Sequence, residues 1–439
     1  MNGLFFISAA LAVPLLLLCR VATGEAVPDS EPTLWRETLS NGLEVIIVPR
    51  GHTATVAVDL YVRFGSCFET EEQSGLANLL SRMLLRGTRT RTSEDSAREI
   101  AGTGGSIQAS AHYLSSSVSV YAPAEAFETM LETVADVTAN PLLDEADLEK
   151  ERRIVLHDLA AREDFPDYVF EREIGARLFP GHPFGRPSDG SPASVSRLTI
   201  ADLRETHQRY FVPGNMLLLI VGNVSVGHAR SLVERQFGTL ESKEQPRAVH
   251  PPMPELDDTL RATINKRVAQ AQLYLAVRMD GIDLRGEYVL SVLDTILSHG
   301  MNSRLFTRIR ETRGYVYDVH VDDTVYPEIV VWGVAAGTEE RHLDEVERLI
   351  RRELDILARE PVSEYELEVA KKFMEANIRR SAEVNDGAAG YIGATIIRER
   401  PLLNVEERVH LVQSVTREEV KELAEKLCGS GEFHVFIMR

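Results

Sequence analysis

Two side chains in the second half of the chain could act together on a polar substrate group. Arg310 lies near the end of a stretch predicted to be helical (residues 302–312), and Tyr317 follows seven residues later. A guanidinium and a phenol hydroxyl are hydrogen-bond donors that can polarise a carbonyl group and stabilise an oxyanion. Arg308 and Arg313 flank the same position, and charge runs of this kind are usually solvated surfaces. On composition alone, a solvated basic helix end followed by an ordinary strand Tyr is therefore the simpler interpretation.

A short apolar helix predicted over residues 74–86 carries the second group of candidate residues. Its polar positions include Asn78, Ser81 and Arg82, and residues 78 and 82 share one helical face because they are four positions apart. Two histidines at that spacing would bind zinc. An amide oxygen is a poor zinc ligand beside imidazole, and a guanidinium stays protonated and repels a cation. We therefore expect no metal site on this helix.

The elements that position these residues recur in two halves of the chain. In the first half, alternating apolar and polar residues predict half-buried strands. The predicted strands are 42–49, 54–64, two within 106–121, and 216–221, and the predicted helices are 74–86, 93–101, 124–138, 145–163, 167–178, one from 200 and one ending near 237. Residues 239–257 contain four prolines and mixed charges, which is typical of a linker.

The same order of elements restarts after this linker. The predicted strands are 259–266, 270–278, 315–321, 328–335 and 432–438, and the main helices are 285–299, 302–312, 339–358 and 363–382. We predict an α+β fold of two tandem homologous α/β units, each a mainly antiparallel sheet with helices on one face. The predicted organisation is a signal peptide at 1–24, a first domain at 25–238, the linker at 239–257 and a second domain at 258–439.

Motifs along nearly the whole mature chain resemble those of the insulinase/pitrilysin family of zinc peptidases, in its processing-peptidase-like branch. Residues 62–66 (Val-Arg-Phe-Gly-Ser) are similar to the strand and turn that precede the family's zinc helix. Residues 151–158 are similar to the stretch that ends in the third zinc ligand, and 181–187 and 210–216 are close to further family signatures. The resemblance places the inverted zinc motif H-x-x-E-H at residues 78–82.

This alignment implies that the chain has lost the family's metal chemistry. Asn78 and Arg82 replace the two histidines, and Ser81 replaces the glutamate that acts as general base. Asp158 replaces the third ligand, a glutamate, with a side chain that is one methylene shorter. Two arrangements are open to Arg82: its guanidinium pairs with Asp158 and with Glu151 across the two helices, or it points into solvent.

The resemblance also implies a role for the second half. Family members place an Arg/Tyr pair across from the zinc, where both side chains bind the substrate peptide, and Arg310 and Tyr317 match that register. Some bacterial members are heterodimers in which one subunit carries the zinc motif and the other carries the Arg/Tyr pair. The implied function is a non-catalytic subunit of a heterodimeric zinc metallopeptidase, with zinc in a homologous partner and a peptide as substrate. Residues 102–109 resemble the edge strand that pairs with extended substrate.

Two other functions remain open. The chain could be a structural or assembly protein, like the zinc-free core subunits of the respiratory bc1 complex, or a module that captures peptides without cleaving them. The Arg/Tyr register separates the peptidase subunit from the scaffold, because a scaffold has no chemical need for Arg310 and Tyr317. Because the zinc motif is missing, a peptidase that is active on its own is the least favoured interpretation.

The composition and the N-terminal residues limit the possible cellular location and the possible partners. The net charge is −19, with 67 acidic and 48 basic residues, which makes nucleic acid a poor partner. The apolar run from Leu4 to Cys19 is short for a membrane span and typical of a signal peptide, so we expect a secreted or periplasmic protein. An uncleaved anchor is the one predicted route to a membrane. Cys67 and Cys428 are 361 positions apart and are expected to be unpaired thiols.

Overall fold

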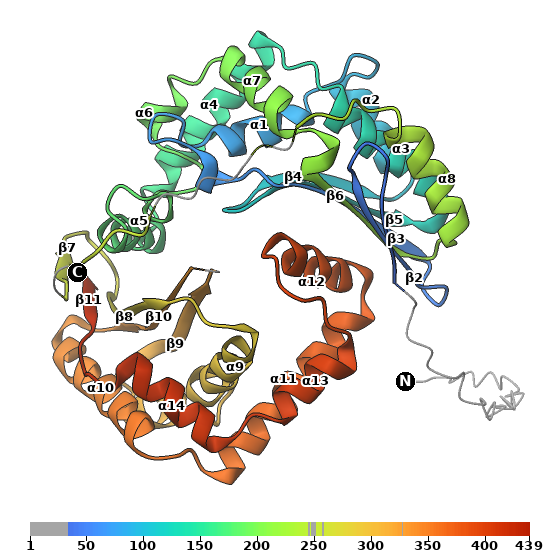
Figure 1. Cartoon of the computed structure of the whole chain (residues 1–439). Coiled ribbons are helices and arrows are strands. Elements are labelled where there is room, and N and C mark those ends of the chain that lie inside the picture. Colours follow the sequence, from blue (N-terminus) through green and yellow to red (C-terminus); the bar gives the residue numbers. More distant parts are fainter. Residues whose placement is uncertain (1–33, 245, 247–251, 257–258, 327) are drawn as a thin grey trace, which may run out of the picture.

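The computed structural model describes residues 34–439 except 245, 247–251, 257–258 and 327. The predicted signal peptide and part of the predicted linker lie outside these residues. The described chain forms two α/β units, each built on one sheet (Figure 1). No helix among the described residues is long and apolar enough to cross a bilayer.

The first sheet has six strands in the order β1-β2-β6-β3-β5-β4, and only β2 and β6 are parallel. The strands are β1 (Trp35–Thr38), β2 (Glu44–Pro49), β3 (Thr55–Val62), β4 (Ser106–Ala111), β5 (Ser116–Pro123) and β6 (Met216–Gly222). The helices of this unit are α1 (Leu76–Leu84), α2 (Ser93–Gly102), α3 (Phe127–Ala139), α4 (Glu145–Arg162), α5 (Pro166–Leu178), α6 (Pro192–Val195), α7 (Ile200–Tyr210) and α8 (Val226–Phe237).

The second sheet has five strands in the order β7-β11-β8-β10-β9, and only β7 and β11 are parallel. Its strands are β7 (Arg261–Ile264), β8 (Ala271–Asp280), β9 (Val316–Val325), β10 (Ile329–Thr338) and β11 (His434–Met438). Its helices are α9 (Leu284–Ser298), α10 (Leu343–Arg359), α11 (Glu364–Glu383), α12 (Asn385–Ile397), α13 (Val405–Gln413) and α14 (Arg417–Cys428), with a π-helical turn, η5 (Phe306–Glu311). The predicted α+β fold of tandem, mainly antiparallel units is confirmed.

The second unit also covers the far face of the first sheet, which the prediction of helices on one face did not include. Strand β6 is buried along its whole length: Leu218 and Ile220 pack with the helices, while Leu217 and Leu219 pack with Ile392 of α12. A strand buried on both faces needs apolar residues at every position, because neighbouring side chains point to opposite faces.

Polar contacts hold α12 against the first unit. The buried Arg50 guanidinium donates to the carbonyl oxygens of Glu383 (2.9 Å) and Val384 (3.3 Å), and the Asn385 side-chain amide donates to the Thr55 carbonyl (2.9 Å). The carbonyls of Glu383 and Val384 flank the start of α12 and that of Thr55 belongs to β3, so these hydrogen bonds fix where the helix lies on the sheet. Figure 1 shows α12 reaching from its own unit toward the strands of the other.

Both cysteines predicted to remain in the mature chain are buried and unpaired. Cys67 follows the turn after β3, and Cys428 ends α14. Burial raises the pKa of each thiol, and for Cys428 the value is about 12. Both groups are therefore neutral at physiological pH and behave as small apolar side chains.

Candidate functional site

Helix α1 starts at a tight turn whose last residues, Ser74 and Gly75, are buried. Gly75 has φ of 91°, and a side chain there would meet the Asp189 carbonyl oxygen at 2.6 Å, so glycine is required. The Glu69 carboxylate accepts hydrogen bonds from the backbone N–H groups of Gly75 (2.9 Å) and Ala77 (2.6 Å), which otherwise have no helical partner. Burial raises the pKa of Glu69 to about 8, and these hydrogen bonds oppose that shift.

Most of α1 is buried in the core of the first unit, which it shares with the neighbouring helix α4. Asn78 and Arg82 are half-buried, whereas Ser81 is buried. The Ser81 hydroxyl has no hydrogen-bond partner among the described residues. These three residues keep the spacing of a metal-binding helix but present no carboxylate and no imidazole.

Arg82 connects α1 to α4 through two carboxylates. Its Nη1 lies 3.5 Å from Glu151 Oε2, and its Nη2 lies 3.3 Å from Asp158 Oδ2. Glu151 and Asp158 share one face of α4 because seven residues make two helical turns. Of the two arrangements open to Arg82, the structure has the paired one.

Arg86, in the turn that follows α1, also pairs with Glu151. Glu151 is 3% exposed, whereas Arg82 and Asp158 are 33% and 44% exposed. One buried carboxylate is therefore held between two guanidiniums at the edge of solvent. We call Arg82, Arg86, Glu151 and Asp158 the ion cluster.

Arg310 and Tyr317 lie next to each other in the second unit. Arg310 is in η5, and a turn at Gly314 (φ 66°) leads into β9, which carries Tyr317. The Arg310 Cζ lies 5.7 Å from the centre of the Tyr317 ring and 5.0 Å from that of Phe306. This cation–π packing orients the guanidinium without using its hydrogen bonds.

Both members of this pair keep their donors free within the described chain. Tyr317 is 72% exposed, and neither its hydroxyl nor the Arg310 guanidinium makes a hydrogen bond or ion pair with any described residue. Two other arginines nearby are used structurally: Arg304 pairs with Glu366 at 2.6 Å, and Arg308 pairs with Glu353. The pair is therefore distinct from an ordinary basic helix end.

The two groups of predicted residues stay on separate units. Figure 1 places α1 and α4 in one unit and β9 in the other. Among the described residues, no hydrogen bond or ion pair joins Arg310 or Tyr317 to Asn78, Ser81, Arg82 or Asp158.

Comparison with known proteins identifies the family. The family model described as Insulinase (Peptidase family M16) matches residues 45–190, and the one described as Peptidase M16 inactive domain matches residues 197–374. An uncharacterized zinc protease of Mycobacterium tuberculosis is 30% identical over 396 residues, covering 89% of this chain and 90% of the relative. The chain belongs to the insulinase family. An uncharacterized zinc protease of Bacillus subtilis is 26% identical, covering 89% and 95%.

Solved structures have the same fold as this insulinase-family chain. A protease from Helicobacter pylori superposes with a TM-score of 0.85 at 20% identity, covering 93% of this chain and 99% of that one. A peptidase M16 inactive domain from Pseudomonas fluorescens gives 0.83 at 21% identity, covering 92% and 98%.

The family implies zinc, but the residues at this site do not fit it. Within the part of the chain that the structure describes, no group of three or more His, Cys, Asp or Glu side chains could hold a metal ion. The Arg82 guanidinium occupies the space between α1 and Asp158, and a fixed positive charge there opposes a cation. His157 does not compensate, since it is 84% exposed and its Nδ1 lies 3.9 Å from Asp158.

We predict that metal removal does not affect the folded chain. Dialysis against a strong chelator should leave the thermal unfolding midpoint unchanged, because the ion cluster joins α1 to α4 without metal. Differential scanning calorimetry with and without added zinc measures this. A midpoint that falls with chelator and recovers with stoichiometric zinc would contradict the prediction.

Sequence reasoning missed Arg86 as a member of the ion cluster. The signal was available, because the helix predicted at 74–86 includes Arg86 four residues after Arg82, on the same predicted face. The prediction considered only the positions of the zinc motif and so overlooked the second guanidinium on Glu151.

Proposed function

We propose that this insulinase-family chain is the non-catalytic subunit of a heterodimeric zinc metallopeptidase. In this proposal Arg310 and Tyr317 bind the substrate peptide at the metal site of a zinc-bearing homologous partner. The observation that carries it is the contrast between the two units. Arg82 closes the former metal position with ion pairs, whereas Arg310 and Tyr317 stay exposed and unpaired within the described chain.

The chemistry of the pair suits a peptide carbonyl in the course of hydrolysis. When water attacks, negative charge develops on the carbonyl oxygen, and donors aimed at that oxygen stabilise the transition state. Arg310 is already held against the rings of Phe306 and Tyr317, so little reorganisation is needed when substrate arrives. The partner supplies the metal and the general base.

The first unit offers a place for an extended peptide. Strand β4 is at the edge of the six-stranded sheet and pairs only with β5. Its outer backbone groups are available for an added strand, in the manner of β-augmentation. We also propose, from the apolar N-terminal run, that both subunits act in a secreted or periplasmic location.

Reconstitution tests this proposal. The mature chain is co-purified with a homologue that has an intact inverted zinc motif and lacks the Arg/Tyr pair, and cleavage of a peptide library is followed by mass spectrometry. We expect cleavage by the mixture and none by this chain alone. No complex, or equal cleavage by the homologue alone, would argue against a two-subunit enzyme.

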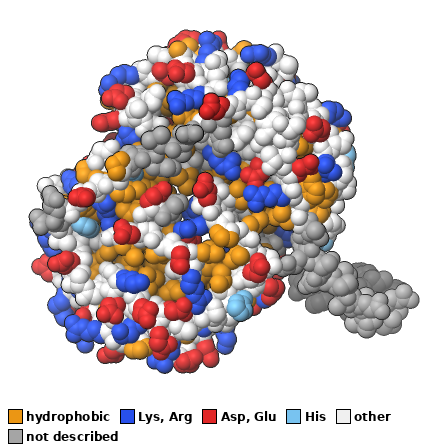
Figure 2. Space-filling model, in the orientation of Figure 1, with side chains coloured by type: hydrophobic (Ala, Val, Ile, Leu, Met, Phe, Trp, Pro, Cys, Tyr) orange, Lys and Arg blue, Asp and Glu red, His pale blue; other side chains and the backbone are white. Residues whose placement is uncertain are grey.

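A module that captures peptides without cleaving them is the second candidate. A cavity of about 660 Å³ lies between the two units, where Phe184 stacks on Tyr113 at 4.1 Å and also meets Tyr326 at 4.1 Å. Figure 2 shows hydrophobic side chains gathered across the middle of the molecule. Tight peptide binding by the isolated chain, unaffected by loss of Tyr317, would favour capture.

A further inference from the structure

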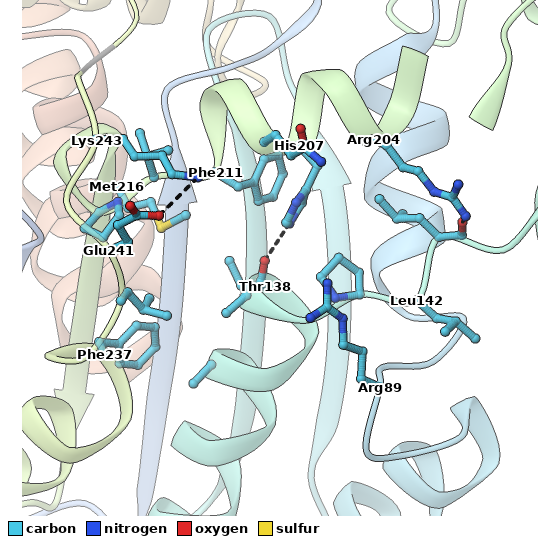
Figure 3. Close-up of a pocket in the computed structure, with 18 residues that line it drawn as sticks. Arg89, Thr138, Leu142, Arg204, His207, Phe211, Met216, Phe237, Glu241 and Lys243 are labelled. Carbon is cyan, nitrogen blue, oxygen red and sulfur yellow. Dashed lines mark hydrogen bonds and ion pairs between the residues drawn. The ribbon is translucent and has the colours of Figure 1, made fainter. Parts of the chain in front are cut away.

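A separate cavity of about 330 Å³ lies in the first unit, away from the ion cluster. It is enclosed by the end of α3, by α7 and by the segment that follows α8 (Figure 3). The proposed peptidase role uses none of its residues. Its volume falls at the lower end of the range for small-molecule sites.

Three cationic side chains and one carboxylate line this cavity. The cations are Arg89, Arg204 and Lys243, and the carboxylate is that of Glu241. Glu241 is 81% exposed, and its Oε2 lies 3.7 Å from the Lys243 Nζ. The lining therefore has a net positive charge in a chain whose total charge is −19. A concave site of the opposite sign to the whole protein attracts and concentrates small anions.

The arginines of this cavity have donors to spare. Arg204 donates through Nη2 to the Leu143 carbonyl (2.9 Å). The Arg89 side chain makes no hydrogen bond or ion pair with any residue that the structure describes. Figure 3 shows the guanidinium of Arg89 below the ring of His207, which is directed at the Thr138 carbonyl. A planar guanidinium with free N–H groups matches a carboxylate or phosphate.

The backbone that holds Arg204 has an unusual conformation. Leu143 has φ of 46°, one of two positive values outside glycine among the described residues. Its side chain is buried and its carbonyl accepts the Arg204 hydrogen bond. A non-glycine residue with a positive φ is strained and persists only where the surrounding contacts hold it in place. Such residues cluster at ligand sites.

Apolar side chains complete the lining. Leu142 is 50% exposed at the cavity, and Phe211 packs against the His207 ring at a centroid distance of 4.7 Å. His207 is fixed in turn by a 2.7 Å hydrogen bond between Nε2 and the Thr138 carbonyl oxygen. Burial lowers the pKa of His207, the hydrogen bond to Thr138 opposes that shift, and the positive charges of Lys243 and Arg89 lower the pKa further.

From this geometry we infer that the cavity is a binding site for a small amphiphilic anion. Its carboxylate or phosphate group is bound by the unpartnered guanidinium of Arg89, while Arg204 and Lys243 add positive potential from the two sides of the cavity. Its short apolar body lies against Leu142 and Phe211. The inference is independent of the peptidase proposal, because it concerns a different face of the first unit and requires no partner subunit.

Calorimetric titration of the full mature chain with three probes tests it. Hexanoate and butyl phosphate each carry an acid group on a short chain, whereas inorganic phosphate has only the charge. We expect at least one of the first two to bind with a Kd of about 1 mM or below, and inorganic phosphate to bind at least about tenfold more weakly. The tighter of the two amphiphiles identifies the preferred acid group.

Matched variants locate the binding. Arg89→Ala should weaken the better probe by about tenfold or more without changing the unfolding midpoint, because that side chain has no partner to lose in the described chain. Arg98→Ala, which removes an exposed arginine from α2, should have no effect. Leu142→Ser should weaken the amphiphile but not inorganic phosphate. Absence of binding by both amphiphiles, or equal binding to wild type and Arg89→Ala, overturns the inference.

Discussion

If the chain forms the proposed heterodimer, replacing Tyr317 by Phe is expected to lower kcat for peptide cleavage by about 100-fold. The substitution removes one hydroxyl that is exposed and has no partner within the described chain, so the folded subunit should be unaffected. Arg310→Ala should lower kcat/KM by a similar factor, because it removes the charged donor that packs against the same ring. Steady-state kinetics with the unmodified zinc-bearing partner measures both values.

Two control variants separate this role from general effects on charge or surface. Arg313→Ala removes an exposed arginine three residues after Arg310, and Tyr365→Phe removes a hydroxyl from a 66% exposed tyrosine on α11. Both should retain wild-type kcat and KM. If Tyr317→Phe and Arg310→Ala also retained them while the heterodimer still formed, the pair would have no part in catalysis.

Most of the fold could be predicted from the sequence because its elements have clear local signals. The apolar helix predicted at 74–86 is α1, and the paired runs around 106–121 are β4 and β5. Strand β1 was missed, since Trp35–Thr38 is short and has alternating exposure that resembles a polar lead-in. The helix predicted at 302–312 contains a π-helical turn, a distinction that residue pattern does not encode.

Contacts between the two units could not be predicted. Helix α12 packs its Ala389, Ile392 and Ile396 on a sheet that is formed more than 150 residues earlier in the chain. Nothing local in the helix specifies that surface. A hint lay in β6, whose uninterrupted apolar run from Met216 to Val221 requires burial on both faces.

The candidate site could likewise be predicted only as far as local spacing determines it. Spacing placed Arg82 opposite Asp158, but spacing alone could not decide between an ion pair and a solvated guanidinium. The cationic cavity was invisible because Arg89, Arg204 and Lys243 come from three distant segments that only the folded chain brings together. The positive φ of Leu143 at this cavity could not be predicted either, because leucine is not a residue type that marks turns.

Glu151→Ala is expected to destabilise the chain by about 3 kcal/mol. The substitution leaves the guanidiniums of Arg82 and Arg86 facing each other across the space of a buried carboxylate. The partial exposure of both arginines allows water to reach them, which places the effect at the lower end of the range for broken buried pairs. Urea denaturation should show a lower midpoint with an unchanged m value, the signature of lost stability rather than an altered unfolded state.

Two neighbouring acids on α4 provide the comparison. Glu149 is 53% exposed and pairs with Arg152 at 3.0 Å, and Asp158 is 44% exposed. Glu149→Ala and Asp158→Asn should each cost about 1 kcal/mol or less, because exposed ion pairs contribute little. A combined Arg82→Met, Arg86→Leu and Glu151→Met variant should recover much of the loss, since apolar replacement of a buried ionic group is often neutral. If Glu151→Ala cost no more than Glu149→Ala, the ion cluster would not hold α1 to α4, and α1 would owe its position to apolar packing alone.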